Sequence, residues 1–573
     1  MFKTLVQDLF AQVSSIEIAP NLIEIPQDRS MGDFALPCFS FAKELKKAPN
    51  VIAQEIADEL SPSGIIAKVE AMGPYVNVSL DTGEVAKQVI EEVMKSWDTY
   101  WSWEDTWKKI LLEWRSPNTH KMLHIGHLRN ALVSETISSI NEFAGNKVHR
   151  TAYGGDIGAH VAKWIWYYVN FTDKTYPTDP EEFGIWSWDL YAKATAEVVN
   201  NEDEYKNQIH EVQRLLETGD KEMLKIWNET RELSIAGLKN VFEELGCTID
   251  RYFRESEVEQ PWIELVKKYE ADESIPLIKK SEGAIIADLE EEDLWVCVLL
   301  KSNGTSLYST KDIALAYLKE EEYDFDVSLY VVATEQNHHF KQVFRVLDLW
   351  GYDTSKLHHV WYELVELPDG KMSSRKWTII PYHVWRNDAK EIALNLINER
   401  EIENKEEVSE MIAFAALKFS MLLQDTYKKI RIDINNSISF DGETGPYLQY
   451  TYARSSSILR KAESEWFKTF ANGEEWSKPM VDWLNKDTER LLALHLSEFS
   501  EVVQRSANEY KPSLVARYVL DLCRMFNAYY QQSKVLIEDD PSWSQARLAL
   551  VASVQQVLKT GLKLLWIEAP VKM

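Results

Sequence analysis

Two histidines three residues apart stand where a loop gives way to a helix. The segment SPNTHKMLHIG is loop-like, and the segment HLRNALVSETISSINEFAG has a helical pattern that ends in glycine. His124 and His127 would share one face of the first helical turn, beside free backbone N–H groups and the positive end of the helix dipole. Gly126 would let a flat adenine ring approach the backbone closely. The arrangement favours a polyphosphate ligand, although a capped helix with solvent-facing histidines has the same pattern.

A second basic loop follows much later in the chain, after the strand-like segment HHVWYELVEL and a turn at 368–370. Three cations and two hydroxyls on a short loop can hold a triphosphate and follow its charge as pyrophosphate leaves. A solvated basic loop is the alternative interpretation. The loop consists of Lys371, Met372, Ser373, Ser374, Arg375 and Lys376.

Together the two loops resemble the H-I-G-H and K-M-S-K-S signatures of class I aminoacyl-tRNA synthetases. The phrase EWRSPNTHK, residues 113–121, resembles the arginyl branch, whose pattern is E-x-S-S-P-N-x-x-K. Arg115 stands where that pattern usually has its first serine. Ser374 replaces the second lysine of the second signature, and Lys121 matches the upstream lysine that arginyl enzymes use instead. The resemblance implies catalytic roles for Lys121, His124, His127 and Lys371, and ATP contacts for His124, Gly126, His127, Lys371, Met372, Ser373, Ser374 and Arg375.

The resemblance also implies a site for arginine. A guanidinium needs a carboxylate in bidentate geometry and polar groups for its remaining donors. The segment YSTKDIA, residues 308–314, resembles the family's Y-x-T-x-D-I-A, whose tyrosine and aspartate contact the guanidinium. Alternatively, the aspartate only caps the helix that follows it. The residues that the match assigns to arginine are Glu113, Ser116, Asn118, Tyr308, Asp312 and Gln336.

Contacts with tRNA are implied at both ends of the chain. The segment GPYLQYTYAR, residues 445–454, resembles the arginyl family's P-Y-x-Q-Y-x-x-A-R, and exposed Tyr and Arg side chains on helices can stack on unpaired anticodon bases. The N-terminal segments GDFA and GPYVN resemble a domain that contacts the elbow of the tRNA. Buried core tyrosines are the alternative in both places. The tRNA-binding residues implied are Tyr75, Asn77, Tyr447, Gln449, Tyr450 and Arg454.

The implied reaction has two steps and no covalent enzyme intermediate. Arginine's carboxylate attacks the α-phosphate of ATP, assisted by Mg²⁺, and the 2′-hydroxyl of the terminal adenosine of the tRNA then attacks the arginyl carbonyl. The resemblance implies that the first step requires bound tRNA. Two rival interpretations stay open: another enzyme with the same fold, and a catalytically silent paralogue that binds tRNA.

These residues require an α/β framework of several domains. We expect a Rossmann-like, doubly wound nucleotide-binding domain with an insertion, a small N-terminal α/β domain and a C-terminal all-α helical bundle. The expected boundaries are an N-terminal domain at 1–82, a linker at 83–104, a catalytic domain at 105–405 with an insertion at about 165–290, and an anticodon-binding domain at 406–573.

Hydrophobic patterns predict individual elements within these domains. We expect helices at 1–14 and 34–60 and one short strand at 68–80. KILLEW is predicted as a buried strand, and SLYVVAT, LHHVWYELVEL and WVCVLL as the strands of the second half of the nucleotide-binding domain. Five long helical segments are predicted beyond residue 405, at 406–430, 447–462, 491–507, 513–536 and 546–565.

Composition narrows the class of protein. Four distant cysteines without a C-x-x-C pair argue against a zinc site or a disulfide framework, and no apolar run is long enough to span a membrane. We therefore expect a cytosolic protein, with no resident metal and no membrane partner, that acts as a monomer on ATP, L-arginine and tRNA. A net charge of −28 does not exclude tRNA, because a local basic face suffices for nucleic-acid binding.

The glycine and tryptophan counts are unusual. The chain has 21 glycines, where average usage predicts about 40, and it has 21 tryptophans. Trp377 and Trp566 stand where the family pattern calls for glycine, and the segment SWEDTWKK would be an ordinary linker with glycines in place of its tryptophans. We hypothesise that some of these tryptophans are UGA codons that the source organism reads as glycine.

Overall fold

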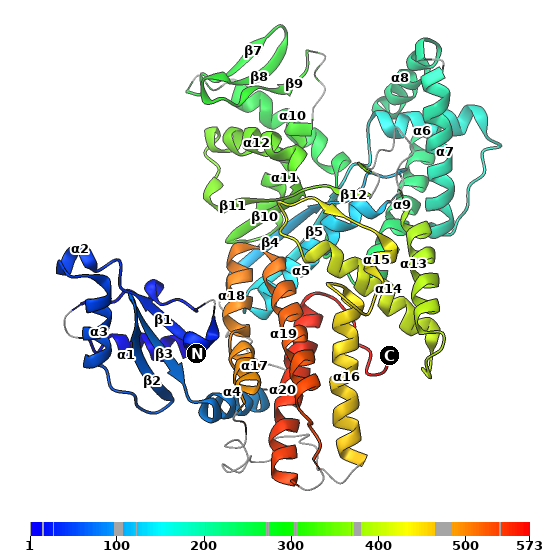
Figure 1. Ribbon diagram of the computed structural model, residues 1–573. Coiled ribbons are helices and arrows are strands. Elements are labelled where there is room, and N and C mark those ends of the chain that lie inside the picture. Colours follow the sequence, from blue (N-terminus) through cyan, green and yellow to red (C-terminus); the bar gives the residue numbers. More distant parts are fainter. Residues whose placement is uncertain are drawn as a thin grey trace.

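In the computed structural model the C-terminal helices lie below the central sheet, and the N-terminal module lies beside those helices (Figure 1). The part of the chain that the structure describes comprises residues 2–13, 16–26, 28–96, 107–121, 123–200, 202–270, 272, 274–302, 304, 308–367, 370–371, 380–464, 484, 486–537 and 540–573. No helix among these residues is long and apolar enough to cross a membrane.

The N-terminal module is a three-stranded antiparallel sheet in the order β1-β3-β2, covered by helices. The expected helix at 34–60 is wrong at its start, because residues 34–37 pair with β3 and the long helix begins only where Pro49 sets its first turn. The single strand expected at 68–80 is two strands, because Gly73, with φ of 61°, and Pro74 turn the chain into a hairpin. The elements are α1 (Phe2–Phe10), β1 (Phe34–Pro37), α2 (Ala42–Leu45), α3 (Pro49–Glu59), β2 (Ile66–Met72) and β3 (Tyr75–Leu80).

A five-stranded parallel sheet forms the centre of the molecule, in the order β11-β10-β4-β5-β6. From β4 the chain continues to β5 on one side, whereas β10 and β11 lie on the other. The expected doubly wound fold is confirmed, and its switch point lies between β4 and β10, where ligands bind at the carboxyl ends of the strands. The elements are β4 (Lys109–Arg115), α5 (Ile125–Phe143), β5 (Lys147–Gly154), β6 (Arg251–Arg254), α11 (Tyr308–Glu322), β10 (Val327–Ala333), α12 (Asn337–Leu349) and β11 (Leu357–Tyr362).

Helices and a small sheet separate the two halves of this domain in sequence. The expected insertion is not one piece, because β6 lies inside its range and pairs with β5 in the central sheet. The expectation that WVCVLL belongs to the nucleotide-binding sheet is wrong: it forms β9, which pairs antiparallel with β8, as so short a connection requires. The elements are α6 (Ala159–Phe171), α7 (Pro180–Asn200), α8 (Glu202–Thr218), α9 (Lys221–Glu244), α10 (Glu255–Glu270), β7 (Ile278–Ser281), β8 (Ala284–Leu289) and β9 (Trp295–Leu300).

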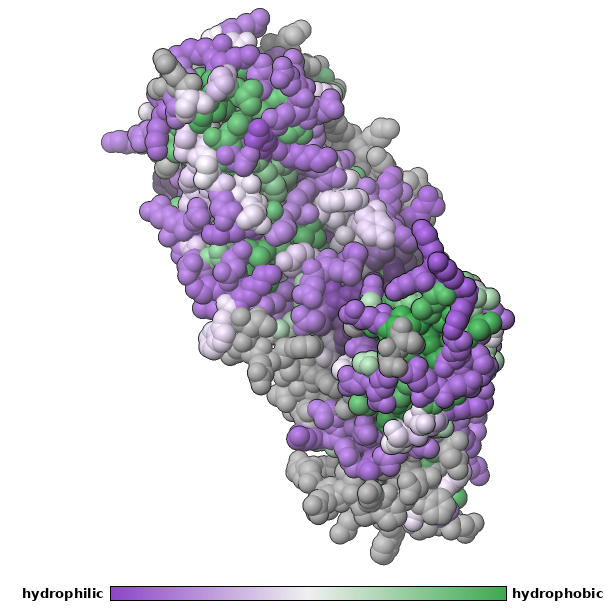
Figure 2. Space-filling model, turned by 90° about the vertical axis from the view of Figure 1, so that its left-hand side faces the viewer, coloured by the Kyte–Doolittle hydropathy of each residue, from purple (hydrophilic) through white to green (hydrophobic). Residues whose placement is uncertain are grey.

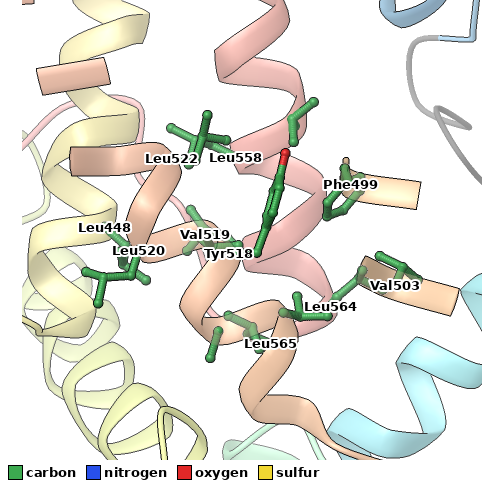
Figure 3. Packing of buried hydrophobic residues seen from close by; sticks show 14 of the residues in the cluster. Leu448, Phe499, Val503, Tyr518, Val519, Leu520, Leu522, Leu558, Leu564 and Leu565 are labelled. Atoms are coloured by element: carbon green, nitrogen blue, oxygen red, sulfur yellow. The ribbon is translucent and has the colours of Figure 1, made fainter. Parts of the chain in front are cut away.

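The C-terminal part is helical, as expected, and packs against α4 (Thr82–Ser96) and α5. The segment at 406–430 leaves its helix at Leu422, and the segment at 491–507 is divided into two helices at Glu498. Figure 3 shows leucines, valines and aromatic residues of α16, α18, α19 and α20 meeting in the bundle core. The elements are β12 (Val365–Leu367), β13 (Gly370–Lys371), α13 (Tyr382–Ile397), α14 (Lys405–Leu422), β14 (Ile430–Arg431), α15 (Ile434–Ser437), α16 (Gly445–Ser464), α17 (Asp487–Ser497), α18 (Phe499–Glu509), α19 (Pro512–Gln532) and α20 (Pro541–Leu564).

Three tryptophans among the described residues have a left-handed backbone, which favours glycine: Trp107 with φ of 61°, Trp295 with φ of 57° and Trp566 with φ of 57°. Trp566 follows α20 just beyond its C-cap, the position at which helices commonly end in glycine. Trp107 and Trp295 are 77% and 70% exposed, so little burial offsets the backbone cost. These conformations are those expected where glycine is the native residue. Trp377 lies outside the described residues.

Candidate active site

The histidine motif lies at the start of α5, at the carboxyl edge of the central sheet. His124 is the N-cap residue, its ring stacks on that of His127 with centroids 3.6 Å apart, and its backbone N–H donates to His127 Nδ1 at 3.3 Å. Burial lowers the pKa of His124 to about 4, and burial, His124 and Lys121 lower that of His127 well below its usual value. Both rings are therefore neutral at pH 7 and offer hydrogen bonds without adding charge.

The two signatures flank the same place. The chain that leaves the second signature is held against the start of α5, because Ile125 N–H donates to Ile380 O at 3.3 Å and Tyr382 N–H donates to Leu123 O at 3.0 Å. Lys371 is placed by its backbone in β13, which pairs with β12. The remaining loop residues predicted to bind ATP, Met372, Ser373, Ser374 and Arg375, lie outside the described residues and stay predictions.

A cavity of about 460 Å³ opens beside the histidine motif at the end of β4. Its volume is in the range of small-molecule sites. The residues that line it come from the end of β4 and the loop after it, from α5, α10 and α11, and from α12 and the turn before it. The two halves of the sheet bring these segments together at the switch point. They are Arg115, Ser116, Pro117, Asn118, Lys121, His127, Glu255, Asp312, Glu335, Gln336 and His339.

Asp312 is the fifth residue of α11, one turn after the helix begins at Tyr308, and is 3% exposed. One carboxylate oxygen forms an ion pair with Arg115, and the other is paired with His339 Nε2. Burial alone would raise the pKa of this carboxyl, but the charge of Arg115 and the bond to His339 lower it. Asp312 is therefore an ionised carboxylate inside the cavity, as a guanidinium site requires.

Glu255, which the sequence did not single out, supplies a second carboxylate to the cavity. It begins α10, is 3% exposed and accepts from Lys311 Nζ at 3.3 Å. Burial raises the pKa of Glu255, and the positive charges of Lys311 and Arg115 offset only part of this rise. The backbone at Gly155 passes so near that a Cβ there would lie 3.2 Å from Glu255 Oε1 and 2.7 Å from Asn118 Oδ1. Only glycine leaves room for these two side chains.

The other polar residues predicted for arginine divide into two groups. Ser116, Asn118 and Gln336 line the cavity; Ser116 accepts from the Tyr252 hydroxyl at 3.1 Å, and Gln336 Oε1 is buried without a hydrogen-bond partner among the described residues. Glu113 instead faces Lys319, with Oε2 2.9 Å from Nζ, and is absent from the lining of the cavity. The backbone at Tyr308 begins α11, and its side chain is not described.

Family models match almost the whole chain. The model described as tRNA synthetases class I (R), catalytic domain, matches residues 90–433. The model of the arginyl tRNA synthetase N terminal domain matches residues 1–80, and that of the DALR anticodon binding domain matches residues 448–573. The chain belongs to the class I arginyl-tRNA synthetase family.

Curated and solved members of the arginyl-tRNA synthetase family are similar over their full length. The arginine–tRNA ligase of Bdellovibrio bacteriovorus is 36% identical over 96% of this chain and 93% of its own. That of Halothermothrix orenii is 34% identical over 100% of both chains. The structure of Thermus thermophilus arginyl-tRNA synthetase, 27% identical, matches with a TM-score of 0.80 over 100% of both chains. The enzyme class, an aminoacyl-tRNA ligase, follows from this membership.

The N-terminal module presents one of the two residues that the arginyl-tRNA synthetase pattern marks for tRNA contact. Tyr75 is partly exposed and meets the ring of Phe39, itself 54% exposed, edge to face at 5.6 Å. Asn77 is 2% exposed, and its amide points to Met72 Sδ at 3.1 Å. Figure 2 views the molecule from the side of this module, where a largely hydrophilic surface is interrupted by separate hydrophobic areas. Phe39 and Tyr75 are the pair accessible to a base.

The C-terminal residues predicted to contact tRNA also include both buried and partly exposed side chains. Gln449 is fully buried and donates to Met411 O at 3.1 Å and Glu568 O at 2.7 Å, so it joins α16 to α14 and to the chain end. Arg454 is partly exposed, with its guanidinium 4.8 Å from the Tyr450 ring and 5.5 Å from the Tyr530 ring.

Tyr447 takes part in the network beneath this group. Its hydroxyl accepts from the Asn527 amide at 3.0 Å, and Arg454 is hydrogen bonded to the same Asn527 side chain. Tyr530, which is 41% exposed and lies on α19, was not foreseen, because its contact with α16 residues depends on helix packing.

Proposed function

We propose that the chain activates L-arginine with ATP to arginyl-adenylate and transfers the arginyl group to the 2′-hydroxyl of the terminal adenosine of its tRNA. The observation that carries this proposal is the cavity in which two buried carboxylates, Asp312 and Glu255, converge a short way from the histidine motif. Two buried carboxylates beside polar groups favour a guanidinium, because it offers parallel N–H donors to a carboxylate, whereas an ammonium or an uncharged group does not.

The first step needs positioning and charge stabilisation but no nucleophilic side chain. Arginine's guanidinium lies toward Asp312 and Glu255, and its carboxylate lies toward His127 and Lys121. Neutral His124 and His127 bind the triphosphate at the start of α5, where backbone N–H groups add a positive potential. Mg²⁺ accompanies ATP, with phosphate oxygens as its ligands.

Lys121 carries the positive charge that the second signature lacks at Ser374. Its position in the cavity lining beside His127 supports this role. Burial lowers the pKa of Lys121, and the negative charge of Glu255 offsets only part of this decrease. A bound triphosphate would raise that pKa again, because its negative charge favours the ammonium form. Lys371, the last residue of β13, is the second cation in the proposal.

The tRNA spans both ends of the chain in this proposal. Tyr75 and Phe39 would stack on bases of the elbow, and Tyr450, Arg454 and Tyr530 on bases of the anticodon loop, since partly exposed aromatic rings next to an arginine suit unpaired bases. We also propose that the domains divide near residues 82, 105 and 405, and that the protein acts as a monomer in the cytosol.

Pyrophosphate exchange tests the proposal. Exchange is expected with arginine in the presence of tRNA and not with the other amino acids, and it should require tRNA. Asp312→Asn should raise the KM for arginine about a hundredfold and leave the KM for ATP unchanged, since it removes one ionised partner of a buried ion pair. Lys121→Met should instead lower kcat.

Asp348→Asn is the matched control, because this carboxylate also pairs with an arginine but lies on the outer part of α12. It should leave both KM values unchanged. Absence of exchange with any amino acid, with tRNA bound, would show a silent paralogue and overturn the proposal.

A further inference from the structure

Arg115 places a guanidinium inside the cavity that is proposed to receive one. It is the last residue of β4, aligned with Tyr153 of β5. Its guanidinium lies 4.7 Å from the Tyr153 ring and forms the ion pair with Asp312. The family pattern has serine at this position, too short to reach Asp312. The chain therefore carries its own ligand for the carboxylate.

We propose that Arg115 is a resident guanidinium that occupies Asp312 in the empty site and must be exchanged for the guanidinium of the substrate. The inference rests on the proposed function and deepens it by naming a residue that sets affinity and selectivity. Arg115 and His339 together take both oxygens of Asp312. A bidentate pair with an incoming arginine uses the same two oxygens, so Arg115 competes with the substrate for this carboxylate.

The exchange can proceed because Arg115 is held less well than a substrate would be. Only its Nη2 bonds to Asp312, and its Nε is buried without a hydrogen-bond partner among the described residues. Free arginine, unconstrained by a backbone, can place two parallel N–H groups on the carboxylate. The displaced Arg115 has another acceptor in the same cavity, because the carboxylate of Glu335 also lines it.

Selectivity follows from the same exchange. The planar guanidinium of Arg115 presents N–H donors that match a carboxylate. An ammonium is a point charge and a ureido group is uncharged, so neither can take the place of this guanidinium in the ion pair with Asp312. Lysine or citrulline would therefore not displace Arg115 from Asp312, whereas arginine would. The cost is a weaker apparent affinity for arginine, since only the fraction of molecules with Arg115 displaced can bind.

Arg115→Ser tests the exchange. In tRNA-dependent pyrophosphate exchange with the full chain, this variant should lower the KM for arginine about tenfold, leave the KM for ATP unchanged, and raise the exchange supported by lysine relative to arginine. Arg115→Lys keeps the charge but loses the fork, so its KM should lie between those of the wild type and Arg115→Ser. Arg345→Ser is the matched control, because Arg345 lies on α12, pairs with Glu292 and Asp348, and is not among the residues that line the cavity.

A folded Arg115→Ser variant whose arginine KM is unchanged or raised would overturn the inference. It would show that Arg115 does not compete with the substrate or that it helps to bind it. If Arg115→Ser does not fold, an Arg115→Lys KM equal to or above that of the wild type has the same meaning. Wild-type protein without arginine-dependent exchange would refute the proposed function instead, so the two failures are distinguishable.

Discussion

The buried pair between Glu113 and Lys319 allows the sharpest test of the fold. The two side chains are 1% and 0% exposed, with Glu113 Oε2 2.9 Å from Lys319 Nζ. Lys319→Met leaves an ionised carboxylate unpaired in the core and should reduce the unfolding free energy by about 3–5 kcal/mol. Glu113→Leu should cost less, because the Lys319 ammonium also lies 3.7 Å from the Tyr330 ring and keeps that partner.

The double variant Glu113→Leu/Lys319→Met distinguishes the interaction between the two residues from their contacts with the rest of the core. Replacing both charges by apolar groups of similar size removes the desolvation cost together with the attraction, so the double variant should be close to wild type in stability. Differential scanning calorimetry of the three variants gives the coupling between the two residues. A double variant whose loss equals the sum of the two single losses would refute the reasoning.

The same variants decide the role of Glu113. The family pattern predicts a contact with arginine, whereas the structure directs this side chain to Lys319 and away from the cavity. We expect the double variant to keep the wild-type KM for arginine. A KM raised tenfold or more in a variant of normal stability would restore the predicted contact.

Three further results are expected. Gly445→Ala should destabilise the protein by about 3 kcal/mol in thermal unfolding, because the added Cβ would lie 2.0 Å from Ala415 O. Gly184→Ala, also in a helix, should instead stabilise the protein by up to about 1 kcal/mol, because no atom lies within 4 Å of the added Cβ. Burial lowers the pKa of His120 to about 3, whereas the pKa of histidine in the unfolded chain is about 6.5. The stability that the neutral, buried His120 contributes is therefore fully present above about pH 6.5 and is lost as the pH falls from about 6.5 toward about 3. His120→Gln should make stability depend less on pH in this range of acid unfolding, and an unchanged curve would contradict this. Mass spectrometry of the protein from its native source should find glycine at 295, 377 and 566, and tryptophan at 377 would end the recoding hypothesis.

The loop and helix at the histidine motif could be predicted because the evidence for them is local. A buried strand, a polar loop and a helix ending in glycine follow one another along a single stretch of chain, and α5 begins two residues before the expected position. Asp312 was predicted for the same reason, from a short phrase at the start of a helix. Neither prediction depended on how distant segments pack.

The remaining features depend on contacts that local patterns do not record. Arg115 was noted only as a departure from serine, because its partner lies on α11, a long way along the chain. Glu255 begins α10 after a four-residue strand, and nothing in its neighbourhood distinguishes it from the many other glutamates of this acidic chain. The placement of β6 in the central sheet likewise depends on its pairing with β5.

Helix α5 is largely buried and joins the C-terminal helices to the proposed ATP site at its start. It packs on β4, β5 and β10 and also on α14, α18, α19 and α20. Its buried polar residues hold specific neighbours: Asn130 donates to Arg115 O at 2.9 Å, and Glu135 pairs with Arg150 at 2.8 Å. A chain cut after the catalytic region would expose this helix to water. The two regions should therefore unfold as one cooperative unit, and neither is a module that evolution could exchange without rebuilding α5.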